Sequence, residues 1–262
     1  MSQFADTPID FERRFGGLNR LYGAHALNFL SRSHVLIVGL GGVGSWAAEA
    51  LARSAIGRLT LIDMDHVAES NINRQIQALD ETLGQAKTAA LKARIAHISP
   101  HCVVHEIDDF VNPENASFFV LQAKSHLPLV ILDCCDQSAA KVALSLAANF
   151  HQVPLALAGS AGGKTKPWLL QKADLKDVIQ DPLLAKVRYQ LRRHHGWSRT
   201  KSLGLTAFFS DEPVQKTDIC AASAGLNCAG YGSSVAVTAT MGMGMAAWAI
   251  DVLLKDKQPV YK

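Results

Sequence analysis

The segment HVLIVGLGGVG at residues 34–44 joins a short apolar run to four closely spaced glycines. His34–Val38 is the pattern of a buried strand, and Gly39, Gly41 and Gly44 have the G-x-G-x-x-G spacing found between a strand and a helix. At such a junction, backbone N–H groups and the helix dipole face a phosphate. The segment therefore predicts a nucleotide site. The alternative is a glycine turn that serves only tight packing.

The sequence on both sides of this segment alternates between strand-like and helix-like blocks. Such alternation is typical of an α/β protein with a Rossmann-like, mostly parallel sheet that is covered by helices on both faces. The further strands are expected at 58–62, 102–107, 129–132 and 154–158, and the helices at 42–55, 85–98, 113–124 and from Asp136 to about Asn149.

The alternation stops after the strand at 154–158. We expect residues 161–232 to form an irregular, substrate-facing insertion, which includes a basic helix-like segment at 181–195. An apolar helix and a tail, residues 233–262, follow it. We therefore predict a single domain whose nucleotide-binding core occupies residues 1–160.

The composition is that of a globular chain, with 48% hydrophobic residues and a mean hydropathy of +0.10. The net charge of +3 does not require a polyanionic partner. The five cysteines form no CxxC pair and the N-terminus resembles no signal peptide, so a cytoplasmic location is expected. The run at 234–254 is apolar enough for a membrane span, but its glycines and Asp251 favour a buried helix, with membrane association as the alternative.

Polar and charged residues gather just beyond the expected strand ends. The diphosphate of a dinucleotide is largely satisfied by a glycine loop, whereas ATP cleaved at its α-phosphate releases pyrophosphate, which needs cations and a metal. Arg74 and Lys87 meet that need, and Asp136 suits Mg²⁺ better than Asp133 does. Each charge taken singly is also explained as a helix cap. The residues expected to bind the nucleotide are Gly39, Gly41, Gly42, Gly44, Asp63, Asp65, Asn71, Arg74, Gln75 and Lys87.

These motifs resemble the adenylating enzymes related to ubiquitin activators and to the activating proteins of thiamine and molybdopterin synthesis. A tRNA-modifying branch of that family is similar over nearly the whole chain. We therefore expect a ThiF-type adenylating domain. The motifs that carry the resemblance are the glycine loop at 39–44, DMD at 63–65, NINRQ at 71–75, GQAK at 84–87 and DCCD at 133–136, with RFGG at 14–17, RLYG at 20–23, GSWAAEALAR at 44–53 and QDPL at 180–183 for the branch.

The resemblance implies ATP and Mg²⁺ as cofactors and tRNA carrying threonylcarbamoyladenosine as the substrate. Its carboxylate, beside the anticodon, would be adenylated, and the modification would then close to a cyclic form with net loss of water. Asp63 would hold the ribose of ATP, and Asp136 would bind magnesium. The residues that would contact the phosphates are Asn71, Arg74 and Lys87.

The resemblance also implies a homodimer, because the family supplies an arginine from the partner subunit's N-terminal segment. Both Arg14 and Arg20 lie in that segment, and Arg20 is slightly preferred. The cyclisation base is not indicated. A sulfur-transfer or cysteine-desulfurase system is a further partner to consider, whereas DNA is not expected.

A dense basic stretch extends from 186 to 201. A tRNA-modifying enzyme needs phosphate contacts of this kind, although a solvated helix face has the same composition. The residues expected to contact tRNA are Arg188, Arg192, Arg193, Arg199 and Lys201.

Two other functions fit parts of the pattern. Adenylation of a sulfur-carrier protein's C-terminus uses the same chemistry, but the chain lacks zinc-binding CxxC pairs and carries the basic stretch. An NAD(H)-dependent oxidoreductase or a nucleotide sensor uses the same glycine loop but leaves Arg74 and Lys87 unexplained.

The sequence departs from the tRNA-modifying branch in two places. Cys134-Cys135 replaces an apolar pair expected in that branch, and residues 202–230 match it only loosely. No cysteine is expected to be catalytic.

Overall fold

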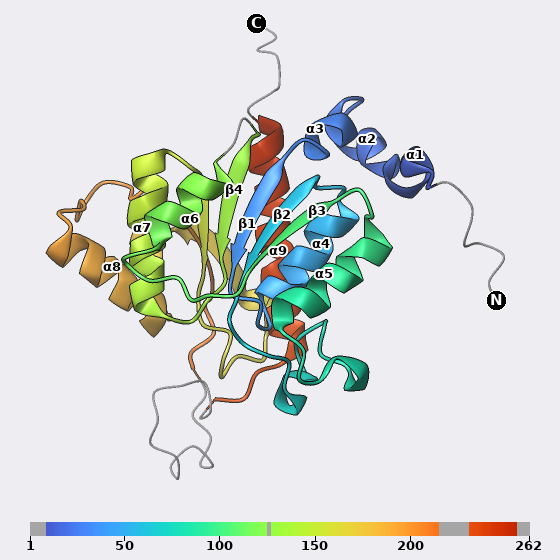
Figure 1. Cartoon of the computed structure of the whole chain (residues 1–262). Coiled ribbons are helices and arrows are strands. Elements are labelled where there is room, and N and C mark those ends of the chain that lie inside the picture. Colours follow the sequence, from blue (N-terminus) through green and yellow to red (C-terminus); the bar gives the residue numbers. More distant parts are fainter. Residues whose placement is uncertain (1–8, 125–126, 215–230, 256–262) are drawn as a thin grey trace, which may run out of the picture.

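Seven strands form one sheet in the order β3-β2-β1-β4-β5-β7-β6 (Figure 1). This is a computed structural model, and it describes residues 9–124, 127–214 and 231–255. The strands are β1 His34–Val38, β2 Arg58–Ile62, β3 Val103–Ile107, β4 Leu129–Asp133, β5 Leu155–Ala158, β6 Leu170–Asp174 and β7 Thr206–Ser210.

All neighbouring strands pair in parallel except β6, which runs antiparallel to β7 at the edge of the sheet. In the register of β1, Val38 lies beside Ile62 of β2 and beside Asp133 of β4. The chain leaves β1 for β2 on one side and enters β4 later on the other. In open α/β sheets, the crevice at this point of reversal, beyond the carboxyl ends of the strands, is where ligands bind.

Helices cover both faces of the sheet, with α4, α5 and α9 on one face and α6, α7 and α8 on the other (Figure 1). Alternate residues of the strands serve the two layers, since Val35 and Ile37 pack with the first group and Leu36 and Val38 with the second. The helices are α1 Phe11–Phe15, α2 Gly17–Tyr22, α3 Ala26–Leu30, α4 Gly44–Arg53, α5 Lys87–Ile98, α6 Ala116–Ala123, α7 Ser138–His151, α8 Pro182–His194 and α9 Val235–Lys255.

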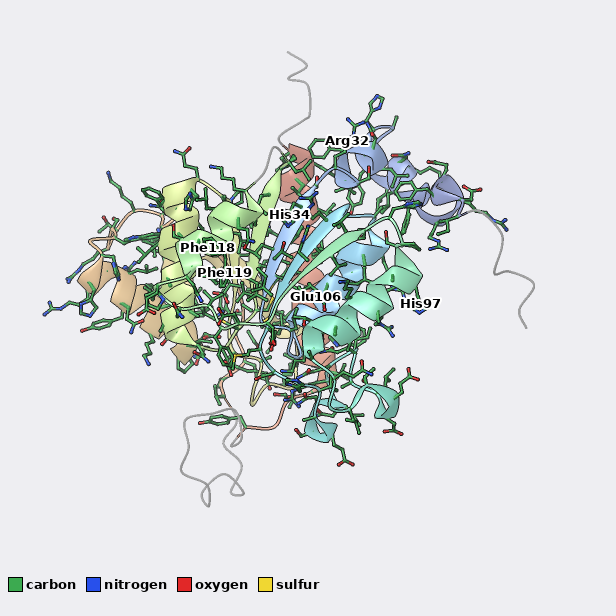
Figure 2. All side chains as sticks on the ribbon, in the orientation of Figure 1. Arg32, His34, His97, Glu106, Phe118 and Phe119 are labelled. Atoms are coloured by element: carbon green, nitrogen blue, oxygen red, sulfur yellow. The ribbon has the colours of Figure 1, made fainter. Side chains whose placement is uncertain are left out.

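The expected α/β architecture is confirmed, and the predicted core strands agree with the structure to within one residue. The helix expected at 113–124 starts only at Ala116. Before it, the side chain of Asn112 accepts hydrogen bonds from the backbone N–H groups of Glu114 and Asn115, and that of Asn115 accepts one from Asn112. These side-chain bonds stabilise a turn in place of the first helical turn. On α6, Phe119 is buried at 6% exposure and Phe118 is 61% exposed (Figure 2).

The helix expected at 181–195 is α8, but the region at 161–232 is more regular than expected, because it also contains two strands of the sheet. The polar composition of β6, Leu170–Asp174, hides it from a search for apolar runs, and only its position at the sheet edge allows that composition. Leu184 and Leu191 of α8 and Phe209 of β7 join the core beside α7. The insertion therefore extends the same sheet.

The apolar helix α9 is long and apolar enough to cross a membrane by length and composition, but half of its most apolar window is buried in the protein. Met241, Met245 and Ala249 follow one another at helical spacing and pack against α4 and the sheet. The core helix of a globular protein has the same composition, so packing accounts for this pattern.

Candidate active site

A cavity of about 720 Å³ opens at the carboxyl ends of β1, β2, β4 and β5. It lies at the point where the strand order reverses, as the sequence predicts for a nucleotide site. The expected site residues that line it are Gly39, Gly41, Gly42, Asp63, Asp65, Asn71, Arg74, Gln75, Lys87 and Asp136.

The glycines of the loop at 39–44 have different structural roles. Gly39 has φ +83°, and a Cβ there would lie 2.7 Å from the backbone nitrogen of Cys135. A Cβ on Gly44 would overlap the carbonyl oxygen of Gly39, so this glycine permits close packing of α4 on β1. A Cβ on Gly41 would meet no atom within 4 Å, which leaves the backbone of this glycine open to the cavity. Gly44, expected among the nucleotide-binding residues, instead serves packing.

The carboxylate of Asp63 holds the glycine loop in place. Its Oδ2 accepts a hydrogen bond from the backbone N–H of Leu40 at 2.6 Å, and its Oδ1 accepts one from that of Asp65 at 2.8 Å. Burial raises the pKa of Asp63, while Lys87, with Nζ 4.0 Å from Oδ1, acts in the opposite direction. Asp63 thus stands at the end of β2, where a carboxylate can also accept hydrogen bonds from a ribose.

Two cationic side chains reach the cavity wall beside Asp63. The ammonium of Lys87 is almost fully buried and donates to Asp65 Oδ2 at 2.7 Å. Arg74 donates to the carbonyl of Ser70 at 2.7 Å and to Asn73 Oδ1 at 2.8 Å. Because both cations line a cavity that also holds a glycine loop, the wall is suited to an anion such as a triphosphate.

The two aspartates after β4 differ in environment. Asp133 is fully buried, and its Oδ1 accepts hydrogen bonds from Lys141 Nζ and from the backbone N–H of Cys135, both at 3.1 Å. Asp136 is exposed and lines the cavity. Of the two, only Asp136 is placed to meet a solvated cation.

The cysteines beside this loop are protonated thiols. Burial raises the pKa of Cys134 to about 12 and that of Cys135 well above its usual range, and the nearby Asp133 adds to both shifts. A thiolate, not a thiol, attacks an acyl adenylate. Neither cysteine is therefore set up as a nucleophile. Cys220 and Cys228 lie outside the described residues.

Comparison with known proteins decides the family. A model of the ThiF family matches residues 17–262. The chain belongs to the ThiF family.

Two curated relatives and one crystal structure are similar over almost their full length. The tRNA threonylcarbamoyladenosine dehydratase of Haemophilus influenzae is 42% identical, covering 95% of this chain and 96% of the relative. That of Escherichia coli is 40% identical, covering 93% and 94%. The crystal structure of the Escherichia coli dehydratase in complex with ATP matches with a TM-score of 0.84 at 39% identity, covering 94% of this chain and 95% of that one.

The N-terminal arginines of this ThiF-family chain lie away from its own nucleotide cavity. Helices α1 and α2 lie at the end of the sheet opposite the glycine loop, beyond α3, which leads into β1 (Figure 1). Arg20 is exposed on α2. Arg14 donates to the carbonyl of Ile98 at 2.9 Å. Neither arginine lines the cavity of its own chain.

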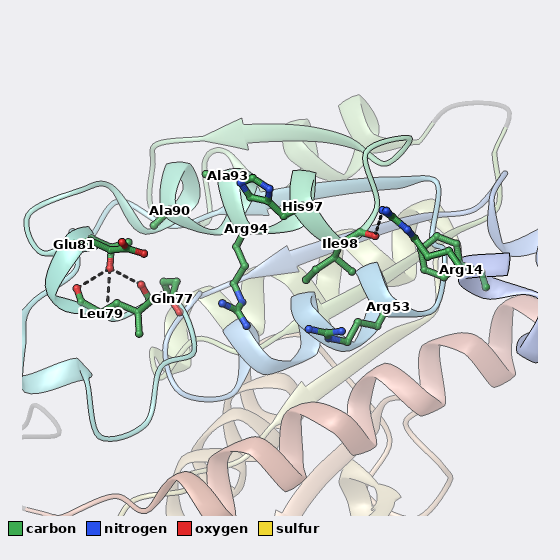
Figure 3. Close-up of a pocket in the computed structure, with 12 residues that line it drawn as sticks. Arg14, Arg53, Gln77, Leu79, Glu81, Ala90, Ala93, Arg94, His97 and Ile98 are labelled. Atoms are coloured by element: carbon green, nitrogen blue, oxygen red, sulfur yellow. Dashed lines mark hydrogen bonds between the residues drawn. The ribbon is translucent and has the colours of Figure 1, made fainter. Parts of the chain in front are cut away.

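Arg14 instead lines a second cavity, also of about 720 Å³, between α1, α5, the end of α4 and the loop at 77–82 (Figure 3). Arg53 and Arg94 of its wall share buried Glu49, with their Nε atoms 2.8 and 2.7 Å from its carboxylate oxygens. Two of the three arginines are therefore neutralised in part by a carboxylate behind the wall.

The basic stretch of the ThiF-family chain divides into inward and outward residues. Arg188 donates to the carbonyls of Leu175 at 3.0 Å and of Val178 at 2.8 Å, so its guanidinium fixes the turn before α8. This differs from its expected role in tRNA contact. Arg192 donates to the carbonyl of Ser198 at 3.2 Å and is half-buried. Of the residues expected to contact tRNA, the exposed ones are Arg193, Arg199 and Lys201.

Sequence reasoning missed several residues of the site. Gln77 is buried and donates to the carbonyl of Leu40 in the glycine loop at 2.9 Å. Lys141 is fully buried below the cavity. The sequence offered a signal for it, because it is the only lysine in the apolar helix α7. Ser160, Phe110 and Tyr231 also line the cavity. No sequence motif pointed to these three residues, because they come from segments far apart in the chain.

Proposed function

We propose that this chain is an ATP-dependent dehydratase of threonylcarbamoyladenosine in tRNA. The observation that carries the proposal is the relative of this activity that is 42% identical over 96% of its length. The likeness to a dehydratase crystallised with ATP, together with a cavity that joins a glycine loop to Arg74 and Lys87, supports the use of ATP.

The reaction balances in two steps. A carboxylate oxygen of the threonyl group attacks the α-phosphorus of ATP, the new O–P bond forms as the bond to the β-phosphate oxygen breaks, and pyrophosphate leaves. A nucleophilic atom of the carbamoyl group then attacks the acyl carbon, the bond to AMP breaks, and AMP and a proton leave. The substrate loses one water in total. Adenylation turns a carboxylate oxygen, a very poor leaving group, into part of a good one.

The site residues act on ATP by binding and orientation. Backbone N–H groups at Gly41 and Gly42 are available to the phosphates, and Asp63 to the ribose. Arg74 and Lys87 stabilise the charge that grows on the leaving pyrophosphate. The remaining polar residues assigned to ATP are Asp65, Asn71 and Gln75.

Magnesium would be held by Asp136 together with the phosphates of ATP. Within the described part of the chain no cluster of three acidic, histidine or cysteine side chains could hold a metal. A single carboxylate beside a triphosphate site nevertheless fits Mg²⁺, which keeps several waters and takes its other ligands from phosphate. When bound, it neutralises phosphate charge.

The homodimer is part of the proposal because the ATP site of one chain lacks the N-terminal arginines. A two-fold axis through the face that carries the second cavity would set the two protomers side by side in opposite directions. The end that carries α1 and α2 in one protomer would then lie beside the glycine-loop end of the other. This arrangement would bring α1 and α2 of one protomer toward the loop that carries Asn71 and Arg74 of the other. Arg20, or else Arg14, would then contact the phosphates.

The exposed basic residues Arg193, Arg199 and Lys201 are the proposed tRNA phosphate contacts, with Arg192 beside them. With tRNA as its substrate, the enzyme is proposed to act in the cytoplasm. The two steps above need no sulfur-transfer or cysteine-desulfurase partner, which the sequence analysis named as a partner to consider.

The test is to incubate the purified protein with ATP, Mg²⁺ and tRNA carrying threonylcarbamoyladenosine, and to measure the mass of the nucleoside after digestion. We expect an ATP-dependent loss of one water, reduced at least tenfold in Asp136→Ala and Lys87→Ala. Lys172→Ala, a change on the exposed edge strand β6, serves as the control. An unchanged nucleoside mass, with pyrophosphate exchange only when a carrier protein is added, would instead support activation of a sulfur carrier.

A further inference from the structure

The nucleotide groups occupy only part of the cavity. The residues assigned to ATP that follow β1 and β2 line one half of the cavity. The other half lies beyond β4, at the carboxyl end of β5, where Gly159, Ser160 and Gly162 face Tyr231 and Leu183. None of these residues has a role in binding ATP in the proposed function. We call this half the β5 subsite. It adjoins Asp136, which follows β4, the strand between β1 and β5 in the sheet.

The β5 subsite is rigidly attached to the fold. Asp181 is buried, and its Oδ2 accepts a hydrogen bond from the N–H of Ser160 at 2.8 Å, while its Oδ1 caps α8 by accepting one from Leu184 at 2.9 Å. A Cβ on Gly159 would overlap Asp181 Oδ2. The QDPL motif thus fixes the segment after β5 to the start of α8.

Backbone contacts also tie the facing wall to this segment. The N–H of Gly163 donates to the carbonyl of Gly232 at 2.9 Å, and Asn73 Nδ2 donates to the carbonyl of Ser233 at 3.0 Å. A Cβ on Gly162 would lie 3.3 Å from Cβ of Tyr231. The absence of a side chain at 162 therefore keeps open the space beside the tyrosine.

Tyr231 is a large aromatic residue that is 41% exposed at the rim of this subsite. Exposed aromatic rings beside an open groove are the means by which proteins hold unstacked bases of RNA, because every base offers a flat face. Among the described residues, a second exposed aromatic ring of the cavity, Phe110, follows β3 on the far side of β2. It is therefore separated from Tyr231 by the strands that carry the nucleotide groups.

We propose that Tyr231 stacks on the modified purine of the tRNA substrate, so that the β5 subsite receives the substrate whose carboxylate accepts the adenylyl group of ATP. This inference rests on the proposed function and names the part of the cavity that binds its substrate. With the purine on Tyr231, the threonyl group extends between Ser160 and Asp136 toward the α-phosphate. The small side chains of the β5 subsite leave room for it.

The test compares Tyr231→Ala with Tyr231→Phe, which keeps the ring. Two quantities are measured for each: the KM for modified tRNA in the dehydration assay, and the Kd for ATP without tRNA. Loss of a stacked base costs ~1–3 kcal/mol, so we expect Tyr231→Ala to raise the KM for tRNA about 5- to 150-fold. The Kd for ATP should stay within about twofold, and Tyr231→Phe should behave like the wild-type protein in both assays.

The two proposals fail in different ways. If the wild-type protein removes no water from any tRNA, the proposed function fails and this inference falls with it. If the wild-type protein is active and Tyr231→Ala has an unchanged KM for tRNA, only the stacking role is overturned. A rise in the Kd for ATP that matches the rise in KM also overturns it, because Tyr231 would then serve the nucleotide or the fold.

Discussion

At the scale of residues, two of the buried basic side chains, Lys141 and His34, are accommodated in different charge states. Lys141 is fully buried against Asp133, and although burial alone would lower its pKa, that carboxylate raises it, so the lysine stays charged. His34 is 2% exposed at the start of β1, and burial lowers its pKa from 6.5 to about 4 (Figure 2). Its Nδ1 donates to the carbonyl of Ala123 and its Nε2 accepts from Thr60 Oγ1, which suits a neutral ring.

His34 predicts a loss of stability in mild acid. Because its pKa is lower in the folded state, the unfolded chain binds a proton first as the pH falls below 6.5, and the stabilisation is lost between pH 6.5 and 4. Between pH 7 and pH 5 this amounts to about 2 kcal/mol of the free energy of unfolding. Urea unfolding of wild type and His34→Asn at both pH values measures it. The pH dependence should shrink by this amount in His34→Asn but not in His194→Asn, an exposed control.

At the scale of elements, the junction of β1 and α4 is defined by glycines with separable roles. Gly44→Ala would force Cβ against the carbonyl oxygen of Gly39, whereas Gly41→Ala meets no protein atom within 4 Å. We expect Gly44→Ala to cost ~1–3 kcal/mol and to lower the Tm by several degrees. Gly41→Ala should keep the Tm and weaken ATP binding, because its methyl group enters the cavity. Thermal unfolding and ATP titration decide, and equal Tm losses would contradict this division.

The elements also show how far sequence patterns extend. The apolar runs at β1, β2 and β4 are buried on both sides of the sheet, so they stand out in the sequence and were predicted. β6 was missed because an edge strand with a solvent-facing side needs few apolar residues. The apolar length of α9 was compatible with either a membrane or a protein core. Its contacts with α4 account for its composition.

At the scale of the whole molecule, the proposed dimer makes each active site depend on two chains. Arg20→Ala and Lys87→Ala should each be inactive alone, since one removes the arginine supplied to the partner and the other removes a residue of the chain's own cavity. Mixed after dissociation and reassociation, they should recover about a quarter of wild-type activity, because half of the dimers then contain one intact site. Arg14→Ala in place of Arg20→Ala tests the other arginine. A mixture with no recovered activity for either arginine would contradict sharing of the site.

The α/β class, the glycine loop and the main polar residues of the cavity are predicted from the sequence, because parallel strands and their loops leave local patterns of apolar runs, glycines and charges. The sequence also placed Asp63, Arg74, Lys87 and Asp136 beyond strand ends, where a common edge of the sheet brings them together. The folded structure was needed to show that Gly44 permits close packing and that Arg188 points inward. It also shows that Lys141 pairs with Asp133 and that Tyr231 lies near Ser160. These relations join segments far apart in the chain, and contacts of that kind leave no periodic trace in a single sequence.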